Sequence, residues 1–393
     1  MRFLIVVVDG MADRPISKLC GRTPLELADA ENMNYLASIG SSGIMAPEKT
    51  NITLGSDLAV LSILGYDLEK HYTGRGSLEA AGAGVDMNKW DLAFRCNICE
   101  IGPGRTILNE KAELPKEEAL RLEERIRVAC SKGLKDVEIL FKHTLGFRGV
   151  LLLRGKMLTL NIVTTQPKRF ASIPDFVPLE RTEEAKYTAE ILSRFLKISE
   201  HESESGKKYA VLPWGGGTKT NLPKFSDRYG FEAAVVAGVP LIKGIGTLCG
   251  MSVVDVPGAT GNFDTDLHGK AKAALETLRE KDLVLLHIEA TDELSHDGNL
   301  EGKIEMIKKV DRMLGEVLDN IALENTRIAL LSDHTTSVEL RSHTNDPVPV
   351  VIAGGSFPRD GIEEYSETAA RRGGLGLFKA EEFMSKLLKH TKL

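Results

Sequence analysis

The sequence predicts an α/β protein whose core is a mostly parallel sheet flanked by helices, with a smaller α/β domain inserted into it. From about residue 231 onward, apolar strand patterns alternate with helical patterns. Such alternation is typical of a parallel sheet covered on both faces. Apolar runs at residues 3–8, 283–288 and 329–331 each lead to acidic side chains or histidines. The chain has 393 residues, which allows two or three domains.

The first part of the chain begins with a predicted buried strand at residues 3–8, directly followed by Asp9. A helical pattern covers residues 58–65, and Ser56 stands where this helix would start. A serine at a helix start is commonly an N-cap. The alternative is a nucleophile whose phosphorylated form the helix amides would stabilise.

The middle of the chain carries few side chains of the kinds that bind metals. Strands are predicted at residues 90–100 and 146–154, and helices at 115–131 and 183–196. We therefore expect a core formed by residues 1–88 and 229–393 and an inserted substrate or lid domain at 89–228.

The last part of the chain returns to the pattern of the core. Strands are predicted at residues 233–237, 253–256 and 283–288, and a long helix at 299–320. A further strand leads to the adjacent pair Asp333 and His334. Because the carboxyl ends of parallel strands meet at one edge of a sheet, these ends can build one site.

The composition excludes several classes of function. A formal net charge of −6 and a pI near 5.9 argue against a surface for nucleic acid or anionic membranes. An odd count of five cysteines fits a reducing compartment, and no apolar run is long enough to span a membrane. We expect a cytoplasmic protein that acts on a small molecule, and the oligomeric state stays open.

Seven side chains are candidates for a metal centre. Mixed carboxylate and imidazole ligands suit zinc or manganese better than calcium. Seven groups exceed the needs of one ion, which indicates two, and two ions could activate a serine hydroxyl and hold a phosphoryl group. Each residue alone is more often a cap, a turn residue or a packing histidine, so the prediction depends on the set. The candidates are Asp9, Ser56, Asp292, His296, Asp333, His334 and His343.

Several motifs resemble those of the archaeal-type cofactor-independent phosphoglycerate mutases, a family of the alkaline phosphatase superfamily. The resemblance spans nearly the whole chain in order. It is carried by the segments at residues 8–15, 55–57, 64–67, 72–76, 256–261, 291–297 and 332–335.

The resemblance implies an alkaline-phosphatase-like core and a phosphoserine intermediate at Ser56. It implies that Asp292, His296 and His343 hold one divalent ion. Asp9, Asp333 and His334, together with Ser56, would hold the other, and manganese, zinc and cobalt are all possible. The reaction would interconvert 3-phosphoglycerate and 2-phosphoglycerate. Arg75 and Lys243 are candidate contacts to the phosphate or carboxylate of the substrate.

The inserted domain departs from the family pattern. Residues 109–115 read Asn-Glu-Lys-Ala-Glu-Leu-Pro where the family usually carries an arginine-rich stretch. This difference leaves open a paralogue with the same chemistry, a phosphatase or a homoserine-kinase-like phosphotransferase acting on another small phosphorylated substrate. A binding protein that has lost turnover is a further alternative, which the complete set of seven candidates disfavours.

Overall fold

The computed structural model describes residues 1–47, 55–133, 137–203 and 205–389, which form two compact units. The first unit comprises Met1–Tyr72 and Leu222–Leu393, and the second comprises Thr73–Asn221. The first unit is therefore built from two separate parts of the chain, and the second lies between them in the sequence.

The first unit is organised around an eight-stranded sheet with the order β12-β11-β13-β1-β14-β17-β2-β18. All neighbouring strands pair in parallel except β17, which is antiparallel to both β14 and β2. This confirms the predicted α/β class with a mostly parallel sheet. The strands are β1 (Arg2–Val8), β2 (Gly40–Ala46), β11 (Ala233–Val236), β12 (Ser252–Val254), β13 (Leu283–Ile288), β14 (Thr326–Leu331), β17 (Val348–Gly354) and β18 (Gly376–Lys379).

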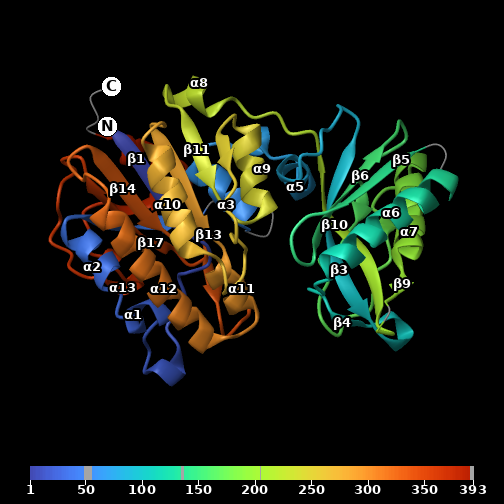
Figure 1. Cartoon of the computed structure of the whole chain (residues 1–393), viewed down its shortest axis with the longest axis horizontal. Coiled ribbons are helices and arrows are strands. Elements are labelled where there is room, and N and C mark those ends of the chain that lie inside the picture. Colours follow the sequence, from blue (N-terminus) through green and yellow to red (C-terminus); the bar gives the residue numbers. More distant parts are fainter. Residues whose placement is uncertain (48–54, 134–136, 204, 390–393) are drawn as a thin grey trace. The chain divides into compact units, whose positions relative to one another are not determined.

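Helices cover both faces of this sheet. Alternate residues of β1, among them Leu4 and Val6, belong to a buried cluster with side chains of α2 (Glu31–Ser38), α10 (Leu267–Leu278) and α12 (Leu300–Asp319). Helices α10 and α12 lie across the sheet in Figure 1. By the two-residue period of a strand, Phe3, Ile5 and Val7 face the opposite side. Helices α3 (Ser56–Ile63) and α9 (Pro240–Leu248) pack against each other, and α9 packs against β11 and β12.

Shorter elements complete the first unit. They are α1 (Pro24–Leu27), α4 (Leu68–His71), α8 (Phe225–Tyr229), α11 (Ala290–His296), α13 (Glu367–Ala370), α14 (Phe383–Leu388) and the hairpin of β15 (Thr335–Ser337) and β16 (Ser342–Thr344).

The second unit has its own antiparallel sheet, with the order β5-β6-β3-β10-β9 and β4 paired to β3. Helices α6 (Lys116–Gly133) and α7 (Glu183–Ser199) contribute side chains to its main buried cluster. A second buried cluster contains Ala80 of α5 (Arg75–Gly82) together with Ala93, Val150 and Leu152 of the sheet. The strands are β3 (Leu92–Ile101), β4 (Ile107–Asn109), β5 (Glu138–His143), β6 (Arg148–Arg154), β9 (His201–Glu202) and β10 (Lys208–Thr218). The separate pair β7 (Ile162–Val163) and β8 (Val177–Pro178) also belongs to this unit.

The boundaries between the units differ from the expected ones at 88/89 and 228/229. The structure divides the chain at 72/73 and 221/222, so α5 belongs with the second unit. The reason is close packing between α5 and β3. A Cβ atom on Gly76 would lie only 1.9 Å from the carbonyl oxygen of Ala93, so no other residue fits there.

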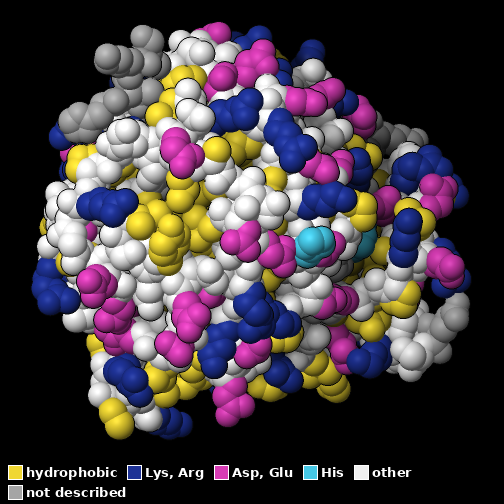
Figure 2. Space-filling model, turned by 60° about the vertical axis from the view of Figure 1, so that its left-hand side comes forward, with side chains coloured by type: hydrophobic (Ala, Val, Ile, Leu, Met, Phe, Trp, Pro, Cys, Tyr) yellow, Lys and Arg dark blue, Asp and Glu magenta, His cyan; other side chains and the backbone are white. Residues whose placement is uncertain are grey.

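Within the described part of the chain, no helix combines the length and hydrophobicity that a membrane crossing requires. On the face drawn in Figure 2, lysine and arginine side chains are interspersed with aspartate and glutamate. This mixture agrees with the small formal net charge of −6.

Candidate metal centre

Three neighbouring strands bring the acidic candidates together. Strand β1 lies between β13 and β14 and is parallel to both, so the three carboxyl ends meet. Asp9 follows β1, Asp333 lies two residues after β14, and Asp292 lies in α11, which begins two residues after β13. The backbone amide of Asp9 donates to the carbonyl of Ile288 at 2.8 Å, which ties the ends of β1 and β13 together.

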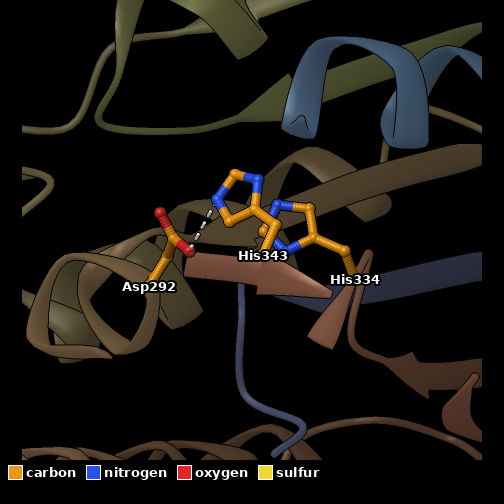
Figure 3. Close-up of side chains that lie close together, drawn as sticks. All are labelled: Asp292, His334 and His343. Atoms are coloured by element: carbon orange, nitrogen blue, oxygen red, sulfur yellow. Dashed lines mark ion pairs between the residues drawn. The ribbon is translucent and has the colours of Figure 1, made fainter. Parts of the chain in front are cut away.

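The first group of donors consists of Asp292, His296 and His343. The Nε2 atom of His296 lies 3.4 Å from Asp292 Oδ2, and the Nε2 atom of His343 lies 3.3 Å from Asp292 Oδ1. The two Nε2 atoms are 2.9 Å apart. Figure 3 shows Asp292 and His343 facing each other, with His334 beside them. The rings of His334 and His343 have centroids 4.0 Å apart, so this group adjoins the second.

The second group of donors surrounds the Nε2 atom of His334. It lies 3.4 Å from Asp9 Oδ1, 3.4 Å from Asp333 Oδ2 and 3.3 Å from Ser56 Oγ. Asp9, Asp333 and His334 are fully or almost fully buried, and Ser56 is 6% exposed. Ser56 is the first residue of α3, as the sequence predicted, while Gly55 takes the N-cap position. The simple N-cap interpretation of Ser56 is therefore wrong.

Thr336 fixes the orientation of His334. Its hydroxyl donates to Asp292 Oδ1 at 2.7 Å, because a carboxylate can only accept. The Nδ1 atom of His334 lies 3.0 Å from the same hydroxyl oxygen and must then be the donor of that bond. A neutral His334 therefore presents the lone pair of Nε2 to Asp9, Asp333 and Ser56, which is the form that binds a metal.

A second histidine is oriented in the same manner. The Nδ1 atom of His296 lies 3.0 Å from the carbonyl oxygen of Arg341 and can only donate to it. The lone pair of Nε2 in a neutral His296 then faces Asp292 and His343. Both rings thus have a hydrogen-bond partner on the side that faces away from the donor groups, as metal-binding histidines commonly do.

The electrostatics reflect four carboxylates in a buried space. Burial, together with the nearby Asp333 and Glu289, raises the pKa of Asp9 well above its usual value. Burial also raises the pKa of Asp333 and lowers the pKa of His334. Although burial acts in the opposite direction, His296 and His343 hold the pKa of Asp292 well below its usual value. The cations of the chain therefore do not offset the cost of ionising Asp9 and Asp333 in this buried space.

Both donor groups fit a divalent cation. Donor atoms at the corners of a tetrahedron with bonds of about 2.0–2.1 Å are roughly 3.3 Å apart. The five carboxylate–imidazole and hydroxyl–imidazole separations described above, from 3.3 to 3.4 Å, match this spacing. Asp333 Oδ2 has no hydrogen-bond partner among the described residues although it is buried. Such an atom is costly unless a cation or another partner meets it.

The two predicted substrate contacts lie in different units. Arg75 starts α5 in the second unit, where its Nε donates to Glu79 Oε1 at 3.1 Å and its guanidinium lies over the Trp214 ring. Lys243 lies in α9 of the first unit, and its Nζ is 2.6 Å from Asp255 Oδ1. Both cations therefore have protein partners, and their contact with a substrate stays a prediction.

Two further ligand-type side chains lie beside the centre and were missed from the sequence. His287 in β13 and Glu289 after it form a group with Asp9 whose ligand atoms all lie within 4.8 Å of one another. In the sequence His287 stands inside the apolar run at residues 283–288, which is the pattern of a buried strand. The spacing of His287 and Glu289 could have indicated the group, because residues two apart in an extended chain point to the same side.

Comparisons with known proteins give full-length matches. The family described as the Metalloenzyme superfamily matches residues 1–390. The 2,3-bisphosphoglycerate-independent phosphoglycerate mutase 1 of Methanothermobacter thermautotrophicus is 39% identical over 402 residues, covering 99% of this chain and 97% of the relative. The 2,3-bisphosphoglycerate-independent phosphoglycerate mutase of Methanopyrus kandleri is 41% identical over 410 residues, covering 98% of this chain and 95% of the relative.

Solved structures agree with these relatives. A Pyrococcus horikoshii protein superposes with a TM-score of 0.81 at 34% identity, covering 100% of this chain and 98% of the other. A cofactor-independent phosphoglycerate mutase from Thermoplasma acidophilum gives a TM-score of 0.64 at 28% identity, with 99% of both chains covered.

Proposed function

The chain belongs to the Metalloenzyme superfamily and, within it, to the family of 2,3-bisphosphoglycerate-independent phosphoglycerate mutases, and we propose that it interconverts 3-phosphoglycerate and 2-phosphoglycerate. The observation that carries this proposal is the position of Ser56. Its hydroxyl lies at the first turn of α3 and 3.3 Å from His334 Nε2, within the second donor group.

In the proposed reaction Ser56 Oγ attacks the phosphorus atom of the substrate. Its proton leaves, the bond between phosphorus and the glycerate oxygen breaks, and that oxygen takes up a proton. The phosphoserine then loses its phosphoryl group to the neighbouring hydroxyl of the glycerate, which gives the isomer. Each transfer exchanges one P–O bond for another, so no external phosphoryl donor is needed.

The residues of the chain have separate parts in this scheme. Amides at the start of α3 would stabilise the negative charge of the phosphoserine. Asp292, His296 and His343 would hold one divalent ion, and Asp9, Asp333, His334 and Ser56 a second. These ions would lower the pKa of the Ser56 hydroxyl and offset charge on the phosphoryl oxygens. Manganese, zinc and cobalt all accept such ligands.

Arg75 and Lys243 are proposed to contact the phosphate or carboxylate of the substrate, which would need their present partners Glu79 and Asp255 to share them. The second unit is proposed as the substrate or lid domain. A cytoplasmic location also stays a prediction, since it was inferred from composition.

The test is to incubate metal-loaded protein with 3-phosphoglycerate and follow both isomers and inorganic phosphate by ³¹P NMR. We expect 2-phosphoglycerate to form without stoichiometric phosphate release. Ser56→Ala should lower the rate by roughly 10³-fold or more. Ser62→Ala is the control, because Ser62 is also buried and lies near the other end of the same helix.

The alternative activities give different results in this assay. Release of phosphate with no 2-phosphoglycerate would indicate a phosphatase. Conversion that is absent with manganese, zinc and cobalt would contradict the mutase proposal and favour a phosphotransferase acting on another substrate, in line with the missing arginines at residues 109–115.

A further inference from the structure

A third group of ligand-type side chains, His287 and Glu289, shares Asp9 with the second donor group. Strand β13 supplies His287, and Glu289 follows it as the N-cap residue of α11. In the register of the sheet, Val7 pairs with His287 and Val8 with Ile288, so Asp9 comes next to Glu289. Asp9 and His287 are fully buried, and Glu289 is 8% exposed.

The two carboxylate oxygens of Asp9 are directed at different imidazoles. Oδ1 lies 3.4 Å from His334 Nε2, within the second donor group, whereas Oδ2 lies 3.3 Å from His287 Nε2. The Asp9–His287 separation of 3.3 Å is close to the carboxylate–imidazole separations of 3.3–3.4 Å in the first two donor groups. They also match the spacing of roughly 3.3 Å expected around a tetrahedral ion.

The imidazole of His287 has no hydrogen-bond partner within the described residues, at either ring nitrogen. Its contact with Asp9 lacks the alignment of a hydrogen bond, although the distance is short enough for one. The other metal-type histidines contrast with this, since Nδ1 of His334 and of His296 each has a partner. A fully buried and unpartnered imidazole is costly, and a cation at Nε2 would remove part of that cost.

The local charge also favours a cation. The carboxyl groups of Glu289 and Asp333 both lie close enough to Asp9 for their charge to act on it. A buried lysine nearby, Lys270, lies close enough for its charge to act on Glu289, and its Nζ donates to the main-chain carbonyl of His287 at 3.1 Å. One lysine offsets only part of the charge that the carboxylates of the centre carry.

We propose that Asp9, His287 and Glu289 form a third divalent-cation site, joined to the second donor group by Asp9 as a bridging carboxylate. One imidazole with two carboxylates favours zinc or manganese over calcium. The chain provides three ligands, so a four-coordinate ion there would need one more from solvent or substrate. This inference does not depend on which phosphorylated substrate the enzyme accepts.

The test counts and locates ions in the full chain. Protein stripped with a chelator is reloaded with Mn²⁺, dialysed against metal-free buffer and analysed by mass spectrometry for manganese per chain. We expect three ions in the wild type and two in His287→Leu and in Glu289→Ala. His268→Gln is the matched control, because His268 is exposed and pairs with Glu316, and it should keep three.

Diffraction from wild-type crystals grown with Mn²⁺ provides a readout that needs no variant to fold. An anomalous peak about 2.0–2.3 Å from His287 Nε2 and Asp9 Oδ2 supports the site. No peak there, or variants that retain three ions, overturns it. The count is separate from activity, so three ions without 2-phosphoglycerate formation would support this site and contradict the proposed function.

Discussion

Thr336 joins the two donor groups to each other by bonding Asp292 with its proton and His334 with its oxygen lone pair, at 2.7 and 3.0 Å. One hydroxyl therefore sets the tautomer of a histidine in one group and the position of a carboxylate in the other.

Thr336→Val should weaken metal binding while preserving the shape of the side chain. Without the hydroxyl, the His334 tautomer with a free Nε2 loses its support, and metal affinity is expected to fall by roughly 10–100-fold. Isothermal titration of stripped protein with Zn²⁺ measures this. Thr335→Val is the control, since Thr335 is also buried but bonds the carbonyl of Asp346. An equal loss in both variants would point to general damage.

Gly10→Ala should disrupt the centre through sterics. Gly10 has φ +60°, and a Cβ atom would lie 2.6 Å from Thr336 Oγ1 and 2.7 Å from Asp292 Oδ1. We expect loss of metal binding and destabilisation well beyond the roughly 1–2 kcal/mol that the left-handed backbone alone costs. Gly21→Ala isolates the backbone cost, because Gly21 has φ +79° with nothing within 4 Å. Urea unfolding of both variants separates the two contributions, and similar values would exclude the steric account.

Glu79→Gln should destabilise the second unit. The Glu79 carboxylate is buried and binds Arg95 Nη1 at 2.6 Å and Arg75 Nε at 3.1 Å. Removing its charge leaves the buried guanidinium of Arg95 uncompensated, which costs about 3–5 kcal/mol. The exposed pair Glu183–Lys186 provides the comparison, and Glu183→Gln should change stability by about 0–1 kcal/mol. Equal effects on the denaturation midpoint would contradict the prediction.

Glu367 should make stability depend on pH. Burial raises its pKa to about 7. Hydrogen bonds donated by the Asp13 amide and the Thr23 hydroxyl favour the charged form and lower the pKa, but burial has the larger effect. A carboxyl with a raised folded-state pKa holds its proton more tightly when folded. Its contribution to stability is therefore complete below the unfolded value of 4.5 and is lost as pH rises through about 7.

Glu367→Gln should remove this dependence, which amounts to something on the order of 3 kcal/mol between pH 5 and pH 8. The measurement is the free energy of unfolding of the wild type and of the variant at both pH values. The change between the two pH values in the wild type, minus the change in the variant, gives the contribution of Glu367. Glu364→Gln, at an exposed position three residues earlier, should leave the wild-type slope unchanged. A wild-type slope in Glu367→Gln would show that other groups cause it.

Much of the core could be predicted because its strands are apolar runs that end in charged residues. Periodicity identified β1, β13 and the long helix α12, expected at 299–320 and observed at Leu300–Asp319. It did not identify β2, whose sequence GSSGIMA lacks an apolar pattern, since its place in the sheet depends on pairing with β17 and β18.

The candidate site could likewise be predicted only in part. The seven predicted residues lie together in the first unit. Asp9, Asp333 and Asp292 do so because they follow the ends of neighbouring parallel strands. The hydrogen bonds that orient them could not be predicted, since the partners Thr336 and the carbonyl of Arg341 are set by tertiary contacts. The sequence pattern did not single out His287, because a histidine within an apolar run is more often a packing residue than a metal ligand.

The hairpin of β15 and β16 controls both imidazoles of the first donor group. His343 pairs with Thr336 across it, and the carbonyl that orients His296 belongs to Arg341, which has a left-handed φ of 53° at the end of the connecting turn. An insertion or deletion of one residue in this stretch would displace both His343 and the carbonyl that orients His296, and so affect two of the proposed metal ligands at once. Homologues that differ in hairpin length should therefore carry compensating changes in α11, and grafting this centre onto another scaffold would require transferring the hairpin whole.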